Sequence, residues 1–192
     1  MIGILDYGAG NLFSVANALN YLGLQNMLTS KEQHFEKISK LLIPGVGAFG
    51  PAMQHLQRSA LIEAIYRWVR QGNPILGICL GMQLFMESSE ESPESKGLGL
   101  IQGCCKKFER GKTPNIGWLQ VSYTENSTKT WFYFVHSYYL APKDTASIKA
   151  LACNNEVFPA ILSYENILGA QFHPEKSGAD GLNFLKTWGE TS

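Results

Sequence analysis

Three short apolar runs, each closed by a glycine-containing turn, limit what the first half of this chain can fold into. The runs are IGIL, KLLI and ILGI, and the turns that follow them are DYGAGN, PGVG and CLG. Between them, residues 12–22 and 56–69 have helical spacing, and Gly72 and Pro74 are suited to ending the second helix. Buried strands that alternate with helices indicate a parallel sheet with helices on both faces. A binding site is then expected at the carboxyl ends of the strands, where all three turns fall.

The second half has a different pattern. WLQVSY, WFYFVHSYYL and AILSYENILGAQF are rich in aromatic and β-branched residues and are separated by turn signals. We expect antiparallel strands that extend the sheet or form a small second one, and a final helix over about residues 180–188. The predicted fold class is therefore α/β, with a mostly parallel central sheet flanked by helices and an antiparallel extension in the C-terminal half. The 192 residues suffice for one domain with a sizeable core, and we expect residues 1–192 to form that single domain.

The composition argues against several classes of function. Sixteen basic residues balance sixteen acidic ones, so no net field attracts nucleic acid or a membrane surface. The N-terminus is typical of a strand, not of a signal peptide, and the apolar stretch around residues 76–86 is too short to span a bilayer. The four cysteines lack CxxC spacing and the histidines are not clustered, which disfavours a zinc site or a disulfide framework. We expect a cytoplasmic protein that uses no metal or cofactor, with residues 87–96 as a solvated acidic loop.

The stretch GICLG has the form of a nucleophile turn, with a strand before it and a helix expected from Leu80. Small residues allow the crowded turn, and Cys79 would project at the sheet edge, where a helix N-terminus favours the thiolate. A free cysteine is also often a small buried hydrophobic residue. This stretch alone supports the two interpretations equally.

The stretch AQFHPEK changes that balance. His173 and Glu175 are two residues apart, so in extended backbone their side chains share one face, and Pro174 suits a rigid strand end. A histidine oriented by a carboxylate is the base that a cysteine nucleophile requires. A lone His-Pro-Glu is more often a surface turn, but the two motifs together favour Cys79, His173 and Glu175 as a catalytic triad.

The PGVG turn ends a strand near the same edge of the sheet. Acyl transfer needs two N–H donors for the oxyanion of the tetrahedral intermediate. The backbone N–H of Leu80 is one candidate, and an N–H at Val46 or Gly47 is the other. An ordinary strand-to-loop turn is the alternative.

The other three histidines carry weaker signals. His34 and His55 lie in polar or helical stretches and are expected at the surface. His136 ends an aromatic strand, and both a structural role and a role as a base are open for it, with structure the more common outcome.

In this order, the stretches GICLGMQ, FVHSY and FHPEKS resemble the class I (triad) glutamine amidotransferases over nearly the whole chain. The DYGAGNL start, PGVGAFG and the lysine after His-Pro-Glu are similar to one branch of that family, the glutaminase subunits of imidazole glycerol phosphate synthases. The resemblance implies that Cys79 attacks the side-chain amide of glutamine, that His173 moves the proton and that Glu175 orients His173. Glutamate and ammonia are the implied products.

The resemblance also implies residues that bind the substrate. Gln83 matches a position that contacts glutamine, one helical turn past Cys79. Glu91 matches a carboxylate that pairs with the α-ammonium of the substrate, which makes it an exception within the acidic loop. Ser137 and Tyr138 match the stretch whose backbone holds the substrate.

A partner is implied in the same way: a (β/α)₈-barrel cyclase or synthase subunit that forms a heterodimer with this chain and consumes the ammonia in histidine biosynthesis. Free ammonia would be protonated and lost in water, so a sealed interface matters. The residues that match positions near that interface are Asn11, Trp118, Tyr133 and Lys176. For Trp118, core packing is an equally supported alternative.

The stretch NIGWL, residues 115–119, departs from the branch's usual His-Met-Gly-Trp-Asn at two polar positions near the expected interface. An alternative is therefore the same glutaminase chemistry feeding a paralogous synthase that aminates a sugar for surface polysaccharide. A cysteine peptidase of similar topology is a third hypothesis, which Gln83 and Glu91 disfavour. A regulatory binding subunit is a fourth, and it requires an unreactive Cys79.

Overall fold

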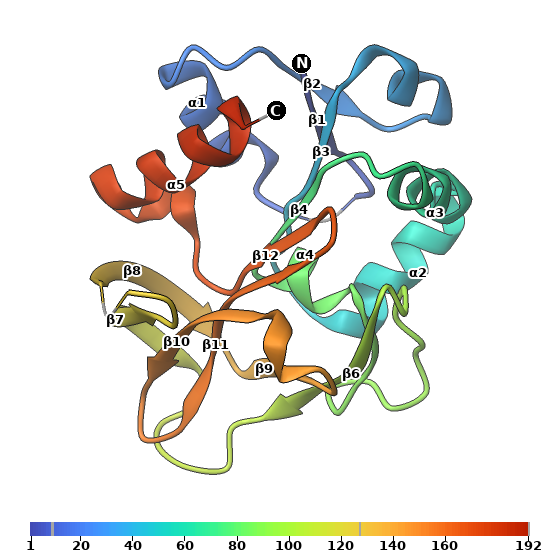
Figure 1. Cartoon of the computed structure of the whole chain (residues 1–192). Helices are drawn as coiled ribbons and strands as arrows, with labels where there is room; N and C mark the ends of the chain where they lie inside the picture. Colours follow the sequence, from blue (N-terminus) through green and yellow to red (C-terminus); the bar gives the residue numbers. More distant parts are fainter. Residues whose placement is uncertain (9, 127, 192) are drawn as a thin grey trace.

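The computed structural model describes residues 1–8, 10–126 and 128–191. Within these residues nine strands form one sheet, in the order β2-β1-β3-β4-β12-β11-β10-β7-β8 (Figure 1). Four of them are parallel neighbours from the first half of the chain: β1 (Ile2–Leu5), β2 (Asn26–Thr29), β3 (Lys40–Ile43) and β4 (Ile75–Ile78). The predicted parallel sheet is confirmed. The edge strand β2 was not predicted, because its NMLT sequence lacks the continuous apolar run of its neighbours.

Helices cover both faces of the parallel strands, as predicted. On one face α1 (Leu12–Tyr21) and α5 (Gly178–Glu190) pack on Ile2, Ile4 and Leu42, and on the other α2 (Phe49–Ser59) and α3 (Ile62–Arg70) pack on Leu5, Leu41 and Ile43 (Figure 1). A short 3₁₀ helix, η1 (Glu32–Lys37), precedes β3.

The prediction of one helix over residues 56–69 was wrong. Ala60 adopts a left-handed conformation with φ 58° and separates α2 from α3, and α2 begins seven residues earlier than expected, at Phe49. The bend lets Leu56, Leu61 and Ile65 all reach the same core. Alanine carries no breaking signal, so sequence spacing alone could not place the bend. Gly72, with φ 77°, does follow the end of α3 as expected.

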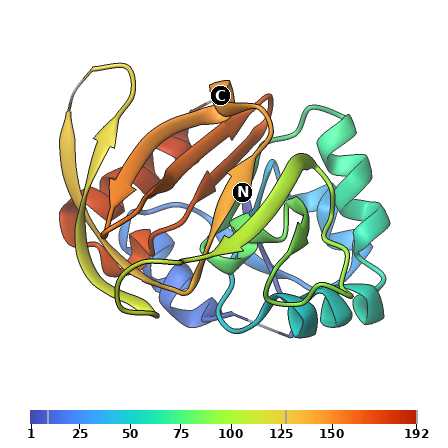
Figure 2. The same ribbon diagram turned by 90° about the horizontal axis from the view of Figure 1, so that it is seen from below.

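The second half supplies both arrangements that were considered. Strands β7 (Asn115–Tyr123), β8 (Lys129–His136), β10 (Ile148–Cys153) and β11 (Val157–Tyr164) extend the main sheet in antiparallel fashion. Among the described residues a second sheet has three strands, β5 (Met86–Ser89), β6 (Ile101–Lys107) and β9 (Tyr138–Pro142) (Figure 2). The short 3₁₀ helix η2 (Thr145–Ser147) links β9 to β10.

Strand β12 (Ile167–Ala170) joins the two halves of the molecule. It is antiparallel to β11 on one side and parallel to β4 on the other. The 3₁₀ helix η3 (Pro174–Lys176) and α5 follow it. Because β4 and β12 run in the same direction, the residues after both strands emerge at one edge of the sheet. Cys79 and His173 are therefore brought together from positions far apart in the chain.

The acidic stretch differs from the expectation of a solvated loop. Its first residues belong to β5, and Ser89 and Ser92 are buried. The helix expected from Leu80, α4 (Leu80–Gln83), is a single turn because the chain moves directly on to β5. In the part of the chain that the structure describes, no helix is long and apolar enough to cross a membrane.

Candidate active site

Cys79 lies in a sharp turn between β4 and α4. Its backbone has φ 52° and ψ −109°, a conformation that costs a residue with a side chain about 1–3 kcal/mol. The Cys79 N–H donates to Ala170 O at 2.7 Å and ties the turn to β12. The glycines on either side are needed for close approach, since a Cβ on Gly81 would lie 1.9 Å from Ile43 O and one on Gly77 would lie 2.6 Å from Met82 N. The glycine pattern thus produces the strained turn from which the thiol projects.

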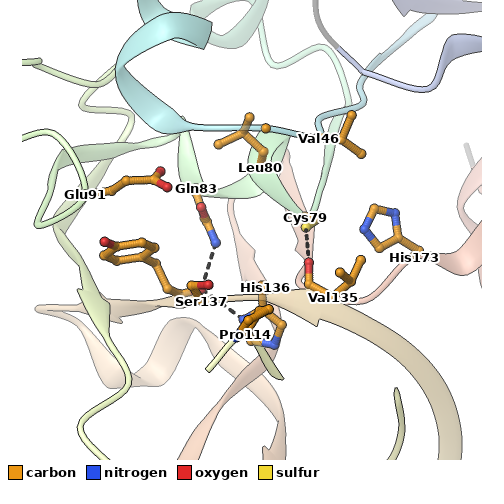
Figure 3. Close-up of a pocket in the computed structure, with 12 residues that line it drawn as sticks. Val46, Cys79, Leu80, Gln83, Glu91, Pro114, Val135, His136, Ser137 and His173 are labelled. Atoms are coloured by element: carbon orange, nitrogen blue, oxygen red, sulfur yellow. Dashed lines mark hydrogen bonds between the residues drawn. The ribbon is translucent and has the colours of Figure 1, made fainter. Parts of the chain in front are cut away.

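The Cys79 side chain faces a cavity of about 320 Å³ that both halves of the molecule enclose (Figure 3). One wall comes from the segments that follow β3, β4 and β5, and the other from the segment before β7, the end of β8 and the segment after β12. The lining residues are Val46, Gly47, Cys79, Leu80, Gln83, Glu91, Pro114, Val135, His136, Ser137, Tyr138 and His173. The volume is in the range usual for small-molecule sites.

His173 and Glu175 form a buried pair at the cavity. His173 Nδ1 lies 2.9 Å from Glu175 Oε1, and both side chains are 2% exposed. The expected cause was wrong, because the backbone is extended only at His173: Pro174 and Glu175 already belong to the 3₁₀ helix η3. Proline fits the first position of such a turn, because its fixed φ is already helical and no N–H is required there.

The backbone of His173 is anchored to β8. Its N–H donates to Tyr133 O at 2.9 Å, and its carbonyl accepts from Ser177 Oγ at 2.6 Å. Ser177 Oγ in turn accepts from Tyr133 N at 2.9 Å. The backbone that carries the imidazole is therefore held against β8, in the antiparallel half of the sheet.

His173 presents Nε2 to the Cys79 side. Nδ1 is the ring nitrogen that faces Glu175. Nε2 is buried and has no hydrogen-bond partner among the described residues. Burial alone would lower the pKa of His173, but the neighbouring Cys79 and the Glu175 carboxylate outweigh it and raise this pKa above its usual 6.5. An imidazole with one nitrogen fixed by a carboxylate and the other free beside a thiol can accept the thiol proton.

The loop between β3 and α2 forms the opposite rim. Gly47 has φ 106°, Val46 is 41% exposed, and no turn or loop hydrogen bond in the described residues uses the N–H of Val46, Gly47 or Leu80. Tyr7, which sequence reasoning missed, donates its hydroxyl to Pro44 O at 2.9 Å and holds the start of this loop. These free N–H groups beside the thiol are suited to binding an oxyanion.

The four residues expected at the substrate lie together in the cavity (Figure 3). Gln83 is 5% exposed, and its Nε2 donates to Tyr138 O at 2.8 Å. Glu91 Oε2 accepts from Phe49 N at 2.7 Å, so this carboxylate also caps the start of α2. Ser137 links β8 to β9, and Tyr138 is the first residue of β9.

The four residues expected at a partner surface lie on η3 and on the elements next to it, since η3 contacts both α1 and β8. Trp118 is 50% exposed, which excludes the core alternative, and its ring meets Tyr133 edge-on with centroids 6.2 Å apart. Lys176 is exposed on η3. Asn11 is exposed as well, but its side chain also caps α1 by accepting from Ser14 N at 3.2 Å.

The other three histidines differ in their burial and hydrogen bonding. His55 is exposed as expected, and His34 is half-buried, with Nδ1 accepting from Ser30 N at 3.3 Å. His136 is 6% exposed, with Nδ1 2.9 Å from Tyr138 O and Nε2 3.0 Å from Asn115 Nδ2. Burial lowers the pKa of His136 to about 4, so its imidazole is neutral at pH 7. Since both nitrogens are occupied, the structural role is favoured over that of a base.

Sequence comparison and structural comparison agree. The family model for class I glutamine amidotransferases matches residues 3–188. The chain is 44% identical over 200 residues to imidazole glycerol phosphate synthase subunit HisH of Chlorobaculum tepidum, covering 99% of this chain and 100% of that protein. It is 40% identical over 198 residues to the subunit of the same name from Bacillus subtilis, covering 96% and 93%.

Solved structures share the fold at low identity. A crystal structure of a glutamine amidotransferase superposes with a TM-score of 0.81 and 18% identity, covering 99% of both chains. PurLQS from Thermotoga maritima gives a TM-score of 0.78 and 18% identity over 96% of this chain and 95% of that one. The predicted α/β fold class is thus confirmed by its structural neighbours. From the family match and the full-length relatives we conclude that this chain belongs to the class I glutamine amidotransferases.

Proposed function

We propose that this chain, working as one domain in the cytoplasm, is the glutaminase subunit of a histidine-pathway synthase. It hydrolyses L-glutamine to L-glutamate and ammonia and passes the ammonia to a (β/α)₈-barrel cyclase partner. The observation that carries the chemistry is the strained Cys79 beside His173, whose Nδ1 is held by Glu175 at 2.9 Å. The pathway is supported by relatives named as HisH subunits at about 40% identity over the whole chain.

The first half of the reaction forms a thioester. His173 Nε2 accepts the Cys79 proton, and the sulfur attacks the carbon of the glutamine side-chain amide. The backbone N–H of Leu80 and one from Val46 or Gly47 stabilise the resulting oxyanion. The Glu175 carboxylate stabilises the imidazolium that forms. His173 then returns the proton to the amide nitrogen, the C–N bond breaks, and ammonia leaves.

The second half regenerates the thiol. His173 Nε2 takes a proton from water, and the oxygen attacks the thioester carbon at the same oxyanion site. The C–S bond breaks, the sulfur regains its proton, and glutamate is released. The chain's own residues supply the nucleophile, the base and the oxyanion donors for both halves.

Glutamine binding uses the rest of the cavity wall. Glu91 is the carboxylate that pairs with the substrate α-ammonium, and its Oε2 is held in place by Phe49 N–H. The backbone of Ser137 and Tyr138 lies along the substrate, and Gln83 contacts it from α4. This set of groups distinguishes a free amino acid from a peptide, which has no α-ammonium at an internal residue.

The exposed ribbon of β7 and β8 supports a protein partner. Ile116 is 60% exposed, Trp118 50% and Trp131 52%, and the strand register places these apolar side chains on one face of the ribbon. Exposed aromatic residues of this density are typical of interaction surfaces. The partner uses the ammonia to make imidazole glycerol phosphate and an aminoimidazole carboxamide ribonucleotide, and that lyase chemistry belongs to the partner.

The test measures glutamate release from glutamine, with and without a histidine-pathway cyclase subunit loaded with its nucleotide ligand. We expect strong stimulation by the loaded partner and loss of all turnover in Cys79→Ala. Turnover that depends on Cys79 but ignores this partner would overturn the pathway assignment and favour another ammonia acceptor, such as a sugar-aminating synthase. Peptide cleavage without glutamine turnover, or no turnover in either condition, would overturn the glutaminase itself.

A further inference from the structure

A run of buried side-chain amides ends at the catalytic sulfur. Gln171, which follows β12 and is fully buried, donates Nε2–H to Cys79 Sγ at 3.8 Å, a distance compatible with a hydrogen bond to sulfur. Its Oε1 accepts from Gln83 Nε2 at 3.3 Å. Gln83 Nε2 also donates to Tyr138 O at 2.8 Å. Gln83 thus donates both to Gln171, which in turn donates to the sulfur, and to the Tyr138 carbonyl.

The same Tyr138 carbonyl is held from the opposite side. His136 Nδ1 is 2.9 Å from it, so the ring carries its proton on Nδ1 and its Nε2 accepts from Asn115 Nδ2 at 3.0 Å. Asn154 Nδ2 donates to Asn115 Oδ1 at 2.8 Å, and the exposed Asn155 donates in turn to Asn154 Oδ1 at 3.2 Å. Every donor and acceptor assignment along this network is mutually consistent, which fixes the orientation of each amide.

The sulfur itself lies between two opposing groups. The Cys79 thiol is 3.8 Å from Val135 O, which can only accept (Figure 3). It is also 3.8 Å from Gln171 Nε2, which can only donate. A carbonyl oxygen favours the protonated thiol, whereas an amide N–H favours the thiolate. In a buried site this preference is strong, because solvent does not screen it.

We propose that Gln171 is a positioning residue that holds the Cys79 sulfur beside His173 and stabilises its thiolate. Its bond to Gln83 connects the nucleophile to the stretch that binds the substrate, Ser137 and Tyr138. The inference deepens the proposed glutaminase function and rests on it for its catalytic meaning. Gln171 acts through Cys79 and Gln83.

Other titratable groups face the sulfur and must be kept constant in any test. His173 approaches from the segment after β12, with Glu175 behind it, and Tyr7 approaches from the segment after β1. Burial, together with the charge of Cys79, raises the pKa of Tyr7, so its phenol is neutral over the working pH range. Substitutions at Gln171 leave all three groups in place.

The experiment measures how fast iodoacetamide alkylates Cys79 as a function of pH, in the full chain and without glutamine. Modification is read on the peptide that contains Cys79, because the exposed Cys153 will also react. Gln171→Met keeps the side-chain length and removes the N–H donor. We expect the pH midpoint of alkylation to rise by about one unit, as for the loss of one hydrogen bond to a charged group. Gln54→Met, on the exposed side of α2, is the matched control and should follow the unmodified chain.

Gln171→Asn is the second variant, since it keeps a polar amide in the core but is too short to reach both Cys79 and Gln83. Circular dichroism identifies which variants fold, and a folded variant with a raised midpoint supports the inference. A folded variant with an unchanged or lowered midpoint would overturn it. Alkylation requires no turnover, so a chain that shows the shift but never releases glutamate would sink the proposed function and leave the role of Gln171 standing.

Discussion

The two buried histidines of the cavity show how one residue type acquires opposite properties in two regions of the molecule. His173 follows β12 beside the parallel strands, and His136 ends β8 in the antiparallel extension. Both are almost fully buried, yet the pKa of His173 is raised and that of His136 is lowered to about 4. Burial acts in the same direction on both, so the difference must come from their neighbours.

Those neighbours differ in charge. His173 has the Glu175 carboxylate on one nitrogen and the Cys79 thiol near the other, so a proton on the ring is stabilised. His136 has the Tyr138 carbonyl and the Asn115 amide, and its ring packs among aromatic side chains such as Phe158, 5.0 Å away between centroids. A neutral, fully bonded imidazole is a structural group, whereas one with a free nitrogen beside an anion is a base.

The largest expected effect comes from replacing each histidine with glutamine. Glutamine can donate to Tyr138 O and accept from Asn115, so His136→Gln should retain kcat for glutamate release within about tenfold. Glutamine cannot accept the thiol proton, so His173→Gln should lose about a thousandfold or more. Equal losses at the two positions would break the comparison and return His136 to the candidates for the base.

Glu175→Gln should bring the pKa of His173 closer to that of His136. Removing the carboxylate lowers the pKa of His173, because the imidazolium loses its counter-charge. We expect kcat to fall by about a hundredfold, with glutamine binding little changed. The test combines steady-state kinetics with an NMR titration of the imidazole carbons. A His173 titration that does not move in the variant would contradict the role given to Glu175.

Acid stability should distinguish the two rings next. Because the pKa of His136 is lower in the folded chain than the 6.5 of the unfolded one, the unfolded state binds the extra proton between pH 6.5 and 4. The contribution of the neutral His136 to the free energy of unfolding is complete above pH 6.5. It decreases on acidification, and about 3 kcal/mol of it is lost at pH 4. The contribution of His173 to stability has the opposite pH dependence. Because the pKa of His173 is raised in the folded chain, this contribution is lost as the pH rises above 6.5.

Urea unfolding of the native chain and of His136→Gln is measured across this pH range. The difference between the two isolates the contribution of His136 to the pH dependence of the free energy of unfolding, since every other titrating group is common to both. The native chain should lose more stability on acidification than the variant. Parallel curves for the two proteins would show that His136 is not held neutral by the fold.

The smallest effect is expected at the far end of the amide network. Asn154→Ala removes the donor to Asn115 Oδ1, and because Asn154 is half-buried, water can replace part of the bond. The free energy of unfolding should fall by about 1 kcal/mol, with kcat for glutamate release within about twofold. Thermal denaturation together with the glutaminase assay measures both. A large loss of activity would mean that the network transmits more to Cys79 than Gln171 alone does.

Much of the fold could be predicted from local patterns. The buried parallel strands, the helices on both faces and the final helix follow from apolar runs, helical spacing and glycine positions, which depend on neighbouring residues only. The bend at Ala60 and the strands β2, β5, β6 and β10 were missed. Their sequences are short or mixed in character, and their structure comes from pairing with distant strands.

The sequence by itself determined the turn at Cys79, since only glycines at Gly77 and Gly81 allow the close approach of β3, β4 and α4. It also placed Glu175 within reach of His173. The tertiary structure decided which partners each buried polar group meets. Gln171 reaches the sulfur, Tyr7 holds the loop of Val46, and His136 is neutral because β12, β1 and β7 carry those partners in from distant parts of the chain. Such contacts have no local sequence signal, because hydrogen bonding and charge act through space and the sheet order decides which residues are neighbours.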